Sequence, residues 1–450
     1  MDATSPYGVA LHKEVSMGSQ RTWRVSALVG ATALLAACGS SSPSSSSSVP
    51  TQSGSAITAG VIAPFTGPAA QFGKLLSAPC FAATDLINKA GGILGKTISC
   101  SAIDDTGDPA DAVPNVTRAI ATTTNLDMAL GLESNTAATT VPLVDAAKIP
   151  IITTNGLVAF TKNSYPYYWR LTPSDDANGA AFAVWAVQKG YKNVAVVFQN
   201  GIGSEGNLPG LTSAMPKLGG TLGLQLTIPA DAASYSSEVA RVISAHPDAL
   251  IWSADPQTTA TFMSEYKQLN NGSIPPMVTA TDSLTPDFFG ALKRVVGVSY
   301  VTQDVYLVGS SFSQTTPAFA TYKAALQADS KTSAIADVLS AVGPPASEYD
   351  GINILALAMV MAKSTVGSYY NQFVTKIISP KPGAVVVSNF ADGLAALKSG
   401  KQIQYVGVLG AVVFNQYHNS AGEFAANMFQ PDGSATRVGS ISGTQVLGLL

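Results

Sequence analysis

Short apolar runs and longer amphipathic segments alternate along most of the chain. From residue 57 onward, the short runs are rich in Val, Ile and Leu, as in buried strands, while the longer segments have the apolar spacing of helices. Strands are expected at residues 57–64, 97–103, 127–132, 149–153, 194–198, 222–228, 249–253 and 277–280. Helices are expected at residues 68–90, 109–123, 136–147, 175–189, 207–218, 235–245 and 257–269. This alternation predicts an α/β fold whose parallel sheets are covered by helices on both faces.

A separate apolar segment, Val25–Ala37, lies near the N-terminus and follows two arginines. A basic region, an apolar core and small residues before a cleavage point are typical of an export signal. The core is too short for a membrane helix, which needs roughly 20 residues. Residues 1–37 are therefore expected to be an export signal. Met17 is the better start, because acidic residues precede the arginines, and residues 1–16 would then not be made.

The end of this segment, Leu35-Ala36-Ala37-Cys38, resembles the lipobox of bacterial lipoproteins. The resemblance implies that Cys38 is lipidated and becomes the new N-terminus, which anchors the protein to the cell membrane. Residues 38–55 are rich in Ser and poor in apolar residues, so they are expected to form a flexible tether. The rest of the chain is expected to work outside the cytoplasm.

Composition narrows the possible functions of the 413 residues that remain after removing 37 from 450. This length is sufficient for two lobes with sizeable cores. Charged residues make up only 12% of the chain, and the net charge is -3, which does not favour nucleic-acid binding. With Cys38 lipidated, Cys80 and Cys100 are the two remaining cysteines. A pair in an oxidising compartment predicts a disulfide.

Several motifs resemble the branched-chain amino-acid (leucine)-binding proteins, and they occur in one order. They are VIAPFTGP at 61–68, QFG at 71–73, INKAGGILGK at 87–96, PII at 150–152, RLTPSD at 170–175 and, more weakly, EYD at 348–350. The resemblance implies a type I periplasmic-binding-protein fold, in which two doubly wound parallel-sheet lobes are joined by three crossover segments. It also implies a solute-binding subunit that works with the permease of an ABC transporter.

By the same resemblance, the first lobe comprises residues 57–174 plus about 303–400. The second lobe comprises residues 175–302 plus about 401–440. Ligands of open parallel sheets bind beyond the carboxyl ends of the strands. The loops that follow strands are therefore the candidate sites, and the cleft between the lobes is the expected position of the ligand.

The resemblance assigns first-lobe site residues to the positions that match the family's motifs. Ser134 and the loop Asn155-Gly156-Leu157 correspond to the groups that hold the ends of an amino-acid ligand, and Phe72 corresponds to an aromatic pocket residue. Ser134 also suits a helix N-cap. Asp175 corresponds to a polar residue beside the hinge, although a carboxylate is equally favourable in the first turn of a helix.

Other positions depart from the family pattern. Leu157 replaces a threonine, while Gly203 and Asp255 stand where pocket aromatics are expected. Asp282 keeps the carboxylate expected to bind the ligand ammonium. These changes favour a larger or more cationic polar solute, bound with the help of Asp255 and Asp282.

Alternative functions find less support in the sequence. Residues 201–206 match G-x-G-x-x-G, but the prolines in the next predicted helix and the absence of a suitably placed acidic residue disfavour a dinucleotide site. His246 and His418 have no metal-ligand spacing, and there is no G-x-S-x-G motif. We therefore expect no cofactor, no metal and no catalytic residue. The first hypothesis is capture of a small solute by cleft closure and its delivery to an ABC importer; the alternatives are an extracellular sensor or, remotely, a hydrolase.

Overall fold

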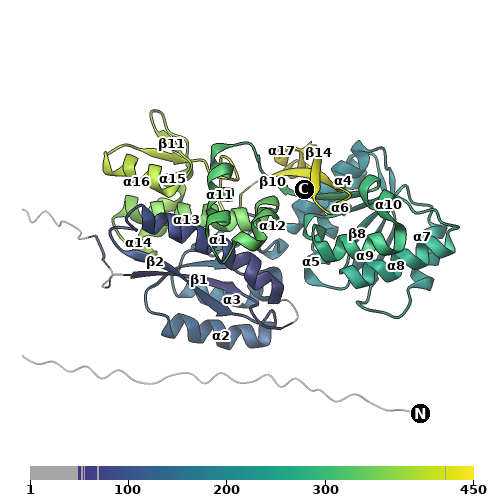
Figure 1. Cartoon of the computed structure of the whole chain (residues 1–450), viewed down its shortest axis with the longest axis horizontal. Coiled ribbons are helices and arrows are strands. Elements are labelled where there is room, and N and C mark those ends of the chain that lie inside the picture. The colour runs from purple at the N-terminus through teal and green to yellow at the C-terminus, as the bar shows by residue number, and fades with distance from the viewer. Residues whose placement is uncertain (1–48, 52–53, 55, 68–69, 421) are drawn as a thin grey trace, which may run out of the picture. The chain divides into compact units, whose positions relative to one another are not determined.

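The computed structural model describes residues 49–51, 54, 56–67, 70–420 and 422–450. The predicted export signal, the lipidation site Cys38 and most of the predicted tether lie outside the described residues. The remainder is an α/β structure built on two large sheets. Each sheet and the helices packed on it form one lobe, which we call the first lobe for the five-stranded sheet and the second lobe for the seven-stranded sheet (Figure 1).

The first lobe begins with strands and helices in strict alternation. Its elements in this part of the chain are β1 (Ala56–Ala63), α1 (Ala70–Lys89), β2 (Thr97–Asp104), α2 (Pro109–Thr122), β3 (Leu126–Gly131), α3 (Ser134–Ala146), β4 (Ile151–Thr153), η1 (Val158–Phe160) and β5 (Tyr168–Arg170). Within the described residues, the five strands form a parallel sheet in the order β2-β1-β3-β4-β5. This order reverses direction beside β1, as in doubly wound sheets.

The chain then builds most of the second lobe. The elements are α4 (Asp175–Gln188), β6 (Asn193–Gln199), α5 (Ile202–Glu205), α6 (Leu208–Lys217), β7 (Thr221–Ile228), α7 (Ser236–Ser244), β8 (Ala249–Ser253), α8 (Pro256–Leu269), β9 (Met277–Ala280), η2 (Thr281–Ser283), α9 (Pro286–Val296), α10 (Val298–Gln303) and β10 (Val305–Ser311). The described strands of this sheet follow the order β14-β13-β10-β9-β8-β6-β7, in which β13 is antiparallel to both neighbours.

The last third of the chain returns to the first lobe and then ends in the second. It contributes α11 (Pro317–Ala328), η3 (Ser333–Ile335), α12 (Ala336–Ala341), α13 (Gly343–Ala362), α14 (Gly367–Tyr370), η4 (Asn371–Phe373), α15 (Val374–Ile378), β11 (Val385–Val387), α16 (Phe390–Lys398) and β12 (Ile403–Tyr405) to the first lobe. It contributes β13 (Glu423–Phe429), β14 (Ala435–Ile441) and α17 (Gly443–Leu447) to the second. The described chain thus crosses between lobes at 171–174, 312–316 and 406–422, as the type I fold requires.

The core of the first lobe is organised around α13. Most of its residues are buried on every side, which explains why it is apolar all round rather than amphipathic. It packs against α1 and the strands β3 and β4. Figure 1 shows it between helices from the early part of the chain, such as α1, and helices from the later part, such as α14. By length and composition, no single described helix suits a membrane span, although α13 taken together with the bent segment Gly367–Ile378 does.

Two predicted lobe boundaries are wrong. The second lobe extends beyond residue 302, because β10 pairs with β9 and β13 of the second sheet. Residues 401–412 belong to the first lobe, because β12 pairs with β11 and Val408 and Val412 lie in the core around α13. A run of apolar residues predicts a strand but does not say which sheet it joins, and this explains both errors.

Cys80 of α1 and Cys100 of β2 are joined by a disulfide in the structure. The bond links a helix to the edge strand of the first sheet and closes a loop with a sequence separation of 20. In the chain-entropy model, a loop of this length contributes about 3 kcal/mol to stability. The disulfide therefore fastens the edge of the first lobe, away from the residues that line the cleft.

Candidate functional site

A cavity of about 260 Å³ lies between the two lobes. Its first-lobe wall comes from the ends of β3 and β4, and its second-lobe wall comes from the ends of β6, β8, β9 and β10. These are the carboxyl ends of parallel strands, where ligands of such sheets bind. Five of the predicted site residues line this cleft: Ser134, Gly156, Asp175, Gly203 and Asp282.

The first-lobe wall is built on a short contact between two loops. The Gly156 backbone N–H donates a hydrogen bond to Ser134 Oγ at 3.2 Å. The proposed N-cap role of Ser134 is wrong, since Glu133 is the N-cap of α3 and accepts from the Asn135 N–H. The Ser134 hydroxyl is consequently not used as a cap and lies in the cleft wall.

The Glu348–Asp350 motif supports this wall from inside the first lobe. Glu348 Oε1 accepts a hydrogen bond from the Gly131 N–H at 2.9 Å, which fixes the end of β3 just before Ser134. Burial raises the pKa of Glu348 well above its usual range. Asp350 Oδ1 accepts from Tyr405 Oη and the Val408 N–H, and so holds the third crossing. The motif has a structural role beneath the cleft.

Asp175 occupies the point where the lobes meet. Its backbone N–H donates to the Gly156 carbonyl at 2.7 Å, and its side chain is 9% exposed. Both Gly156 and Gly206 face its carboxylate, and a Cβ built on either would lie within 2.6 Å of a carboxylate oxygen. Both predicted roles of Asp175 fit the structure, because it is also the first residue of α4.

The electrostatic surroundings of Asp175 disfavour its charge. Burial, followed by repulsion from Asp282 and Asp176, raises the pKa of Asp175 to about 7, and the cation Arg170 opposes this effect. Asp282 lines the cleft with part of its surface exposed there. Desolvation by the surrounding protein raises its pKa. The described residues that line the cleft include no Lys, Arg or His. The titratable side chains in this lining are therefore the carboxyl groups of Asp175 and Asp282.

The other predicted site residues lie outside the cleft lining. Asn155 is fully buried and its Nδ2 donates to Thr153 Oγ1, while Leu157 packs in the first-lobe core. Phe72 is 43% exposed on α1 and does not line the cavity. Asn155 and Leu157 are therefore buried inside the first lobe, and Phe72 lies at its surface. Gly156, between Asn155 and Leu157, lines the cavity instead.

Asp255 is the N-cap of α8. Its Oδ1 accepts from the Gln257 and Thr258 N–H groups, both at 2.8 Å, and its Oδ2 accepts from Thr258 Oγ1 at 2.7 Å. A carboxylate with both oxygens engaged in a helix cap has little capacity left for a ligand. Asp255 therefore lies outside the cavity lining and its use as a ligand carboxylate stays a prediction, whereas Asp282 lines the cleft.

The G-x-G-x-x-G stretch contributes to the cleft as well. Gly203 and Ser204 lie in the short helix α5, and Asn207 follows it before α6 begins. All three line the cavity, and Asn207 Nδ2 donates to the Gly203 and Ser204 carbonyls. Hydrogen bonds thus hold this stretch in the wall of a small cavity.

Sequence reasoning missed several polar lining residues. Asn178, Ser204, Asn207, Ser253 and Ser310 all line the cleft. Ser253 could have been found, because it ends a predicted strand, and Asn178 lies one turn after Asp175 on the same helix. Ser310 could not, because residues from about 303 onward were assigned to the first lobe, whereas β10 belongs to the second sheet.

Residues 56–366 match the profile of a family described as periplasmic binding protein, and this match covers more than half of the chain. The chain belongs to this family. The predicted resemblance to branched-chain amino-acid-binding proteins is confirmed, as is the type I fold.

Known relatives of this periplasmic binding protein agree in sequence over a short stretch and in fold over most of the chain. It is 47% identical to Leu/Ile/Val-binding protein homolog 3 of Brucella melitensis over 57 residues, which are 13% of this chain and 16% of that relative. It is 16% identical to the leucine-binding protein LivK of Thermotoga maritima, with a TM-score of 0.66 over 86% of this chain and 99% of that one. The isoleucine complex of LivJ from Streptococcus pneumoniae is 18% identical, with a TM-score of 0.67 and the same coverage.

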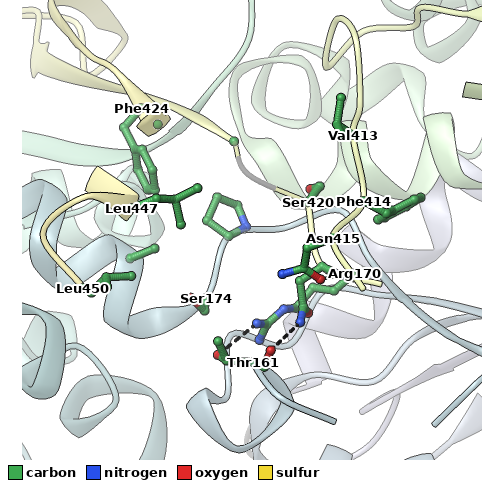
Figure 2. A pocket seen from close by; sticks show the side chains of 15 residues that line it. Thr161, Arg170, Ser174, Val413, Phe414, Asn415, Ser420, Phe424, Leu447 and Leu450 are labelled. Carbon is green, nitrogen blue, oxygen red and sulfur yellow. Dashed lines mark hydrogen bonds between the residues drawn. The ribbon is translucent and has the colours of Figure 1, made fainter. Parts of the chain in front are cut away.

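A second cavity of this periplasmic binding protein, about 250 Å³, lies where the third crossing meets the C-terminal segment (Figure 2). Phe414, Phe424 and Leu447 give it a mainly apolar lining. The Arg170 guanidinium, which is almost fully buried, points toward Thr161 and donates to the Leu157 carbonyl at 2.9 Å. The cation is engaged in fixing the loop that carries Gly156.

The described residues of this periplasmic binding protein hold no group of three or more His, Cys, Asp or Glu that could bind a metal ion. The cleft instead offers hydroxyl, amide, carboxylate and backbone groups, which suit reversible binding of a small polar molecule.

Proposed function

We propose that this protein is the solute-binding subunit of an ABC importer, held at the cell membrane by lipid on Cys38. It captures a small, polar, amino-acid-like solute in the cleft and delivers the solute to the permease. The observation that carries this proposal is the cleft itself, where Ser134 and Gly156 from one lobe face Asp175 and Asp282 from the other. Hinge closure around a ligand is the usual motion of this class of protein.

The charges suggest how an amino-acid-like solute would be oriented. Asp175 and Asp282 suit an ammonium group, because each is a carboxyl group in the cleft that forms no ion pair within the described part of the chain. The first-lobe wall suits the carboxylate end, because Ser134 Oγ accepts from the Gly156 N–H and its own O–H is available to donate to a ligand. Such charge-assisted hydrogen bonds are about twice as strong as neutral ones.

Binding is tested by thermal unfolding of the protein from Ala56 onward in the presence of individual amino acids, amides and polyamines. A ligand at about 100 times its Kd is expected to add about 2.7 kcal/mol of stability, which raises the midpoint visibly. Ser134→Ala should reduce this rise for the active compound. The control Ser330→Ala, at an exposed serine outside the cleft lining, should leave it unchanged.

A folded protein that responds to no compound in the panel would contradict solute capture. Transport is tested separately in a strain that lacks this protein, using the compound that binds. Loss of uptake of that compound supports the importer, whereas intact uptake with loss of a transcriptional response supports the alternative role as a sensor.

The anchor is tested with Cys38→Ala in the full chain. We expect this variant to leave the membrane fraction, because lipid chains supply the attachment. Ser41→Ala, in the same Ser-rich stretch, should remain with the membrane. Membrane association of Cys38→Ala equal to that of the unaltered protein would contradict the proposed anchor.

A further inference from the structure

Three residues that line the cleft each carry a buried acceptor oxygen with no hydrogen-bond partner among the described residues. These oxygens are Asp175 Oδ2, Asn178 Oδ1 and Asn207 Oδ1. Buried polar atoms are nearly always paired, and leaving one unpaired carries its full desolvation penalty. Three unpaired acceptors around one cavity indicate a ligand that supplies hydrogen-bond donors.

The orientation of Asn207 is fixed by its other contacts. Its Nδ2 donates to the carbonyls of Gly203 and Ser204, at 3.0 and 3.2 Å, so its Oδ1 remains as the acceptor. The side chain is only 6% exposed. The protein therefore presents an acceptor oxygen in a defined place. The Asn207 amide cannot rotate to offer its Nδ2 donor to a ligand without breaking both hydrogen bonds.

The remaining second-lobe wall is polar as well. Ser253 Oγ donates to Ser204 Oγ at 3.0 Å, and Ser310 adds a further hydroxyl. Among the described lining residues there is no aromatic side chain, and Val308 is the one branched aliphatic residue. A ligand with an isobutyl or isopropyl group would cover these polar atoms without pairing them. A hydrophobic side-chain pocket is normally lined mainly by apolar residues.

We propose that the solute is a compact molecule that carries hydroxyl or amide N–H groups where branched-chain amino acids carry methyl groups. The ammonium group meets Asp175 and Asp282, and the polar side group donates to the oxygens of Asn178 and Asn207. This inference rests on the proposed function, because it describes the rest of the solute in the same cleft. The volume of about 260 Å³ restricts the ligand to a small molecule.

Two pairs of nearly isosteric amino acids test this inference. Threonine differs from valine, and asparagine from leucine, mainly by polar groups in place of methyl groups. Calorimetric titration of the protein from Ala56 onward should show threonine or asparagine binding at least about tenfold more tightly than its apolar counterpart, since a site built for hydrogen bonds rejects ligands that lack them.

Each outcome of this titration decides something. Tighter binding of valine and leucine would overturn the donor-rich ligand and leave solute capture intact. Absence of binding by all four amino acids would overturn this inference and also count against an amino-acid-like solute in the proposed function.

A variant series links the preference to Asn178, which is partly exposed and whose Oδ1 has no hydrogen-bond partner among the described residues. Asn178→Leu should reduce the polar-over-apolar preference about tenfold, while Asn178→Asp, which keeps an acceptor oxygen, should retain it. Gln188→Leu, at the exposed end of the same helix, is the matched control. An unchanged preference in a folded Asn178→Leu protein would overturn the assignment of this residue.

Discussion

Gly179→Ala is expected to lower the free energy of unfolding by about 3 kcal/mol, the upper part of the usual range for overpacking. A Cβ at Gly179 of α4 would lie 1.8 Å from the Asn207 carbonyl oxygen. A Cβ at Gly210 of α6 would lie 1.7 Å from the Asp176 carbonyl oxygen. In both cases the obstacle is backbone, so α4 and α6 must move apart. Urea unfolding of the ligand-free protein measures the effect.

Gly201→Ala and Gly203→Ala are the controls, because a Cβ at either position meets nothing within 4 Å. They should change the free energy of unfolding by less than about 1 kcal/mol. Equal stability of Gly179→Ala and these controls would contradict the close approach of the two helices. That approach matters for the cleft, since Asn178 and Asn207 lie at the contact and both line the cavity.

Asp175→Asn is expected to make the ligand-free protein more stable at pH 8, by up to about 4 kcal/mol. The pKa of Asp175 is raised from 3.8 to about 7, chiefly by burial, and about 1.4 kcal/mol corresponds to each factor of ten in this equilibrium. The folded state holds this proton up to about pH 7, whereas the unfolded chain releases it near pH 4. Stability therefore falls as the pH rises from about 4 to 7, and the amide removes this contribution.

The measurement is the free energy of unfolding at pH 4.5 and pH 8 for both proteins. The difference between them should be small at pH 4.5 and large at pH 8. Asp127 and Glu133, whose pKa values burial also raises to about 7, will leave a residual fall in Asp175→Asn. Asp111→Asn, at an exposed position, should reproduce the pH dependence of the unaltered protein. If Asp175→Asn also reproduced the pH dependence of the unaltered protein, ionisation of Asp175 would not destabilise the folded state.

The proposed role of Asp175 in binding a cationic solute would account for this loss of stability. An ionised Asp175 between the lobes is costly without a ligand, and a cationic ligand would relieve both the burial cost and the repulsion from Asp282. Binding sites are commonly less stable than their surroundings for this reason. The substitution that stabilises the ligand-free protein is thus also expected to weaken binding of an ammonium-bearing solute.

Local sequence predicted most elements of the fold between β1 and β9. The apolar runs predicted β1 to β4 and β6 to β9, and the longer segments predicted α1 to α4 and α6 to α8, because buried residues recur in these elements at the spacing of strands and helices. Motif order then indicated the type I fold. Ser134, Gly156, Asp175, Gly203 and Asp282 were found by the same means, since they follow strands or begin a helix at recognisable motifs.

Only the tertiary structure decided which of the remaining polar groups reach the cleft. Asp255 and Asn155 stand in loops after strands just as the lining residues do, but hydrogen bonds to their own neighbourhood hold them elsewhere. Asn178 and Asn207 belong to different helices, and the glycines at their contact bring them to one wall. β10 joins the second sheet through pairing with β9 and with β13, and β13 lies more than 100 residues later in the chain. A local pattern of apolar residues specifies a helix or strand and its buried face. Contacts between residues far apart in the sequence specify which sheet a strand joins and which side chains reach the cleft.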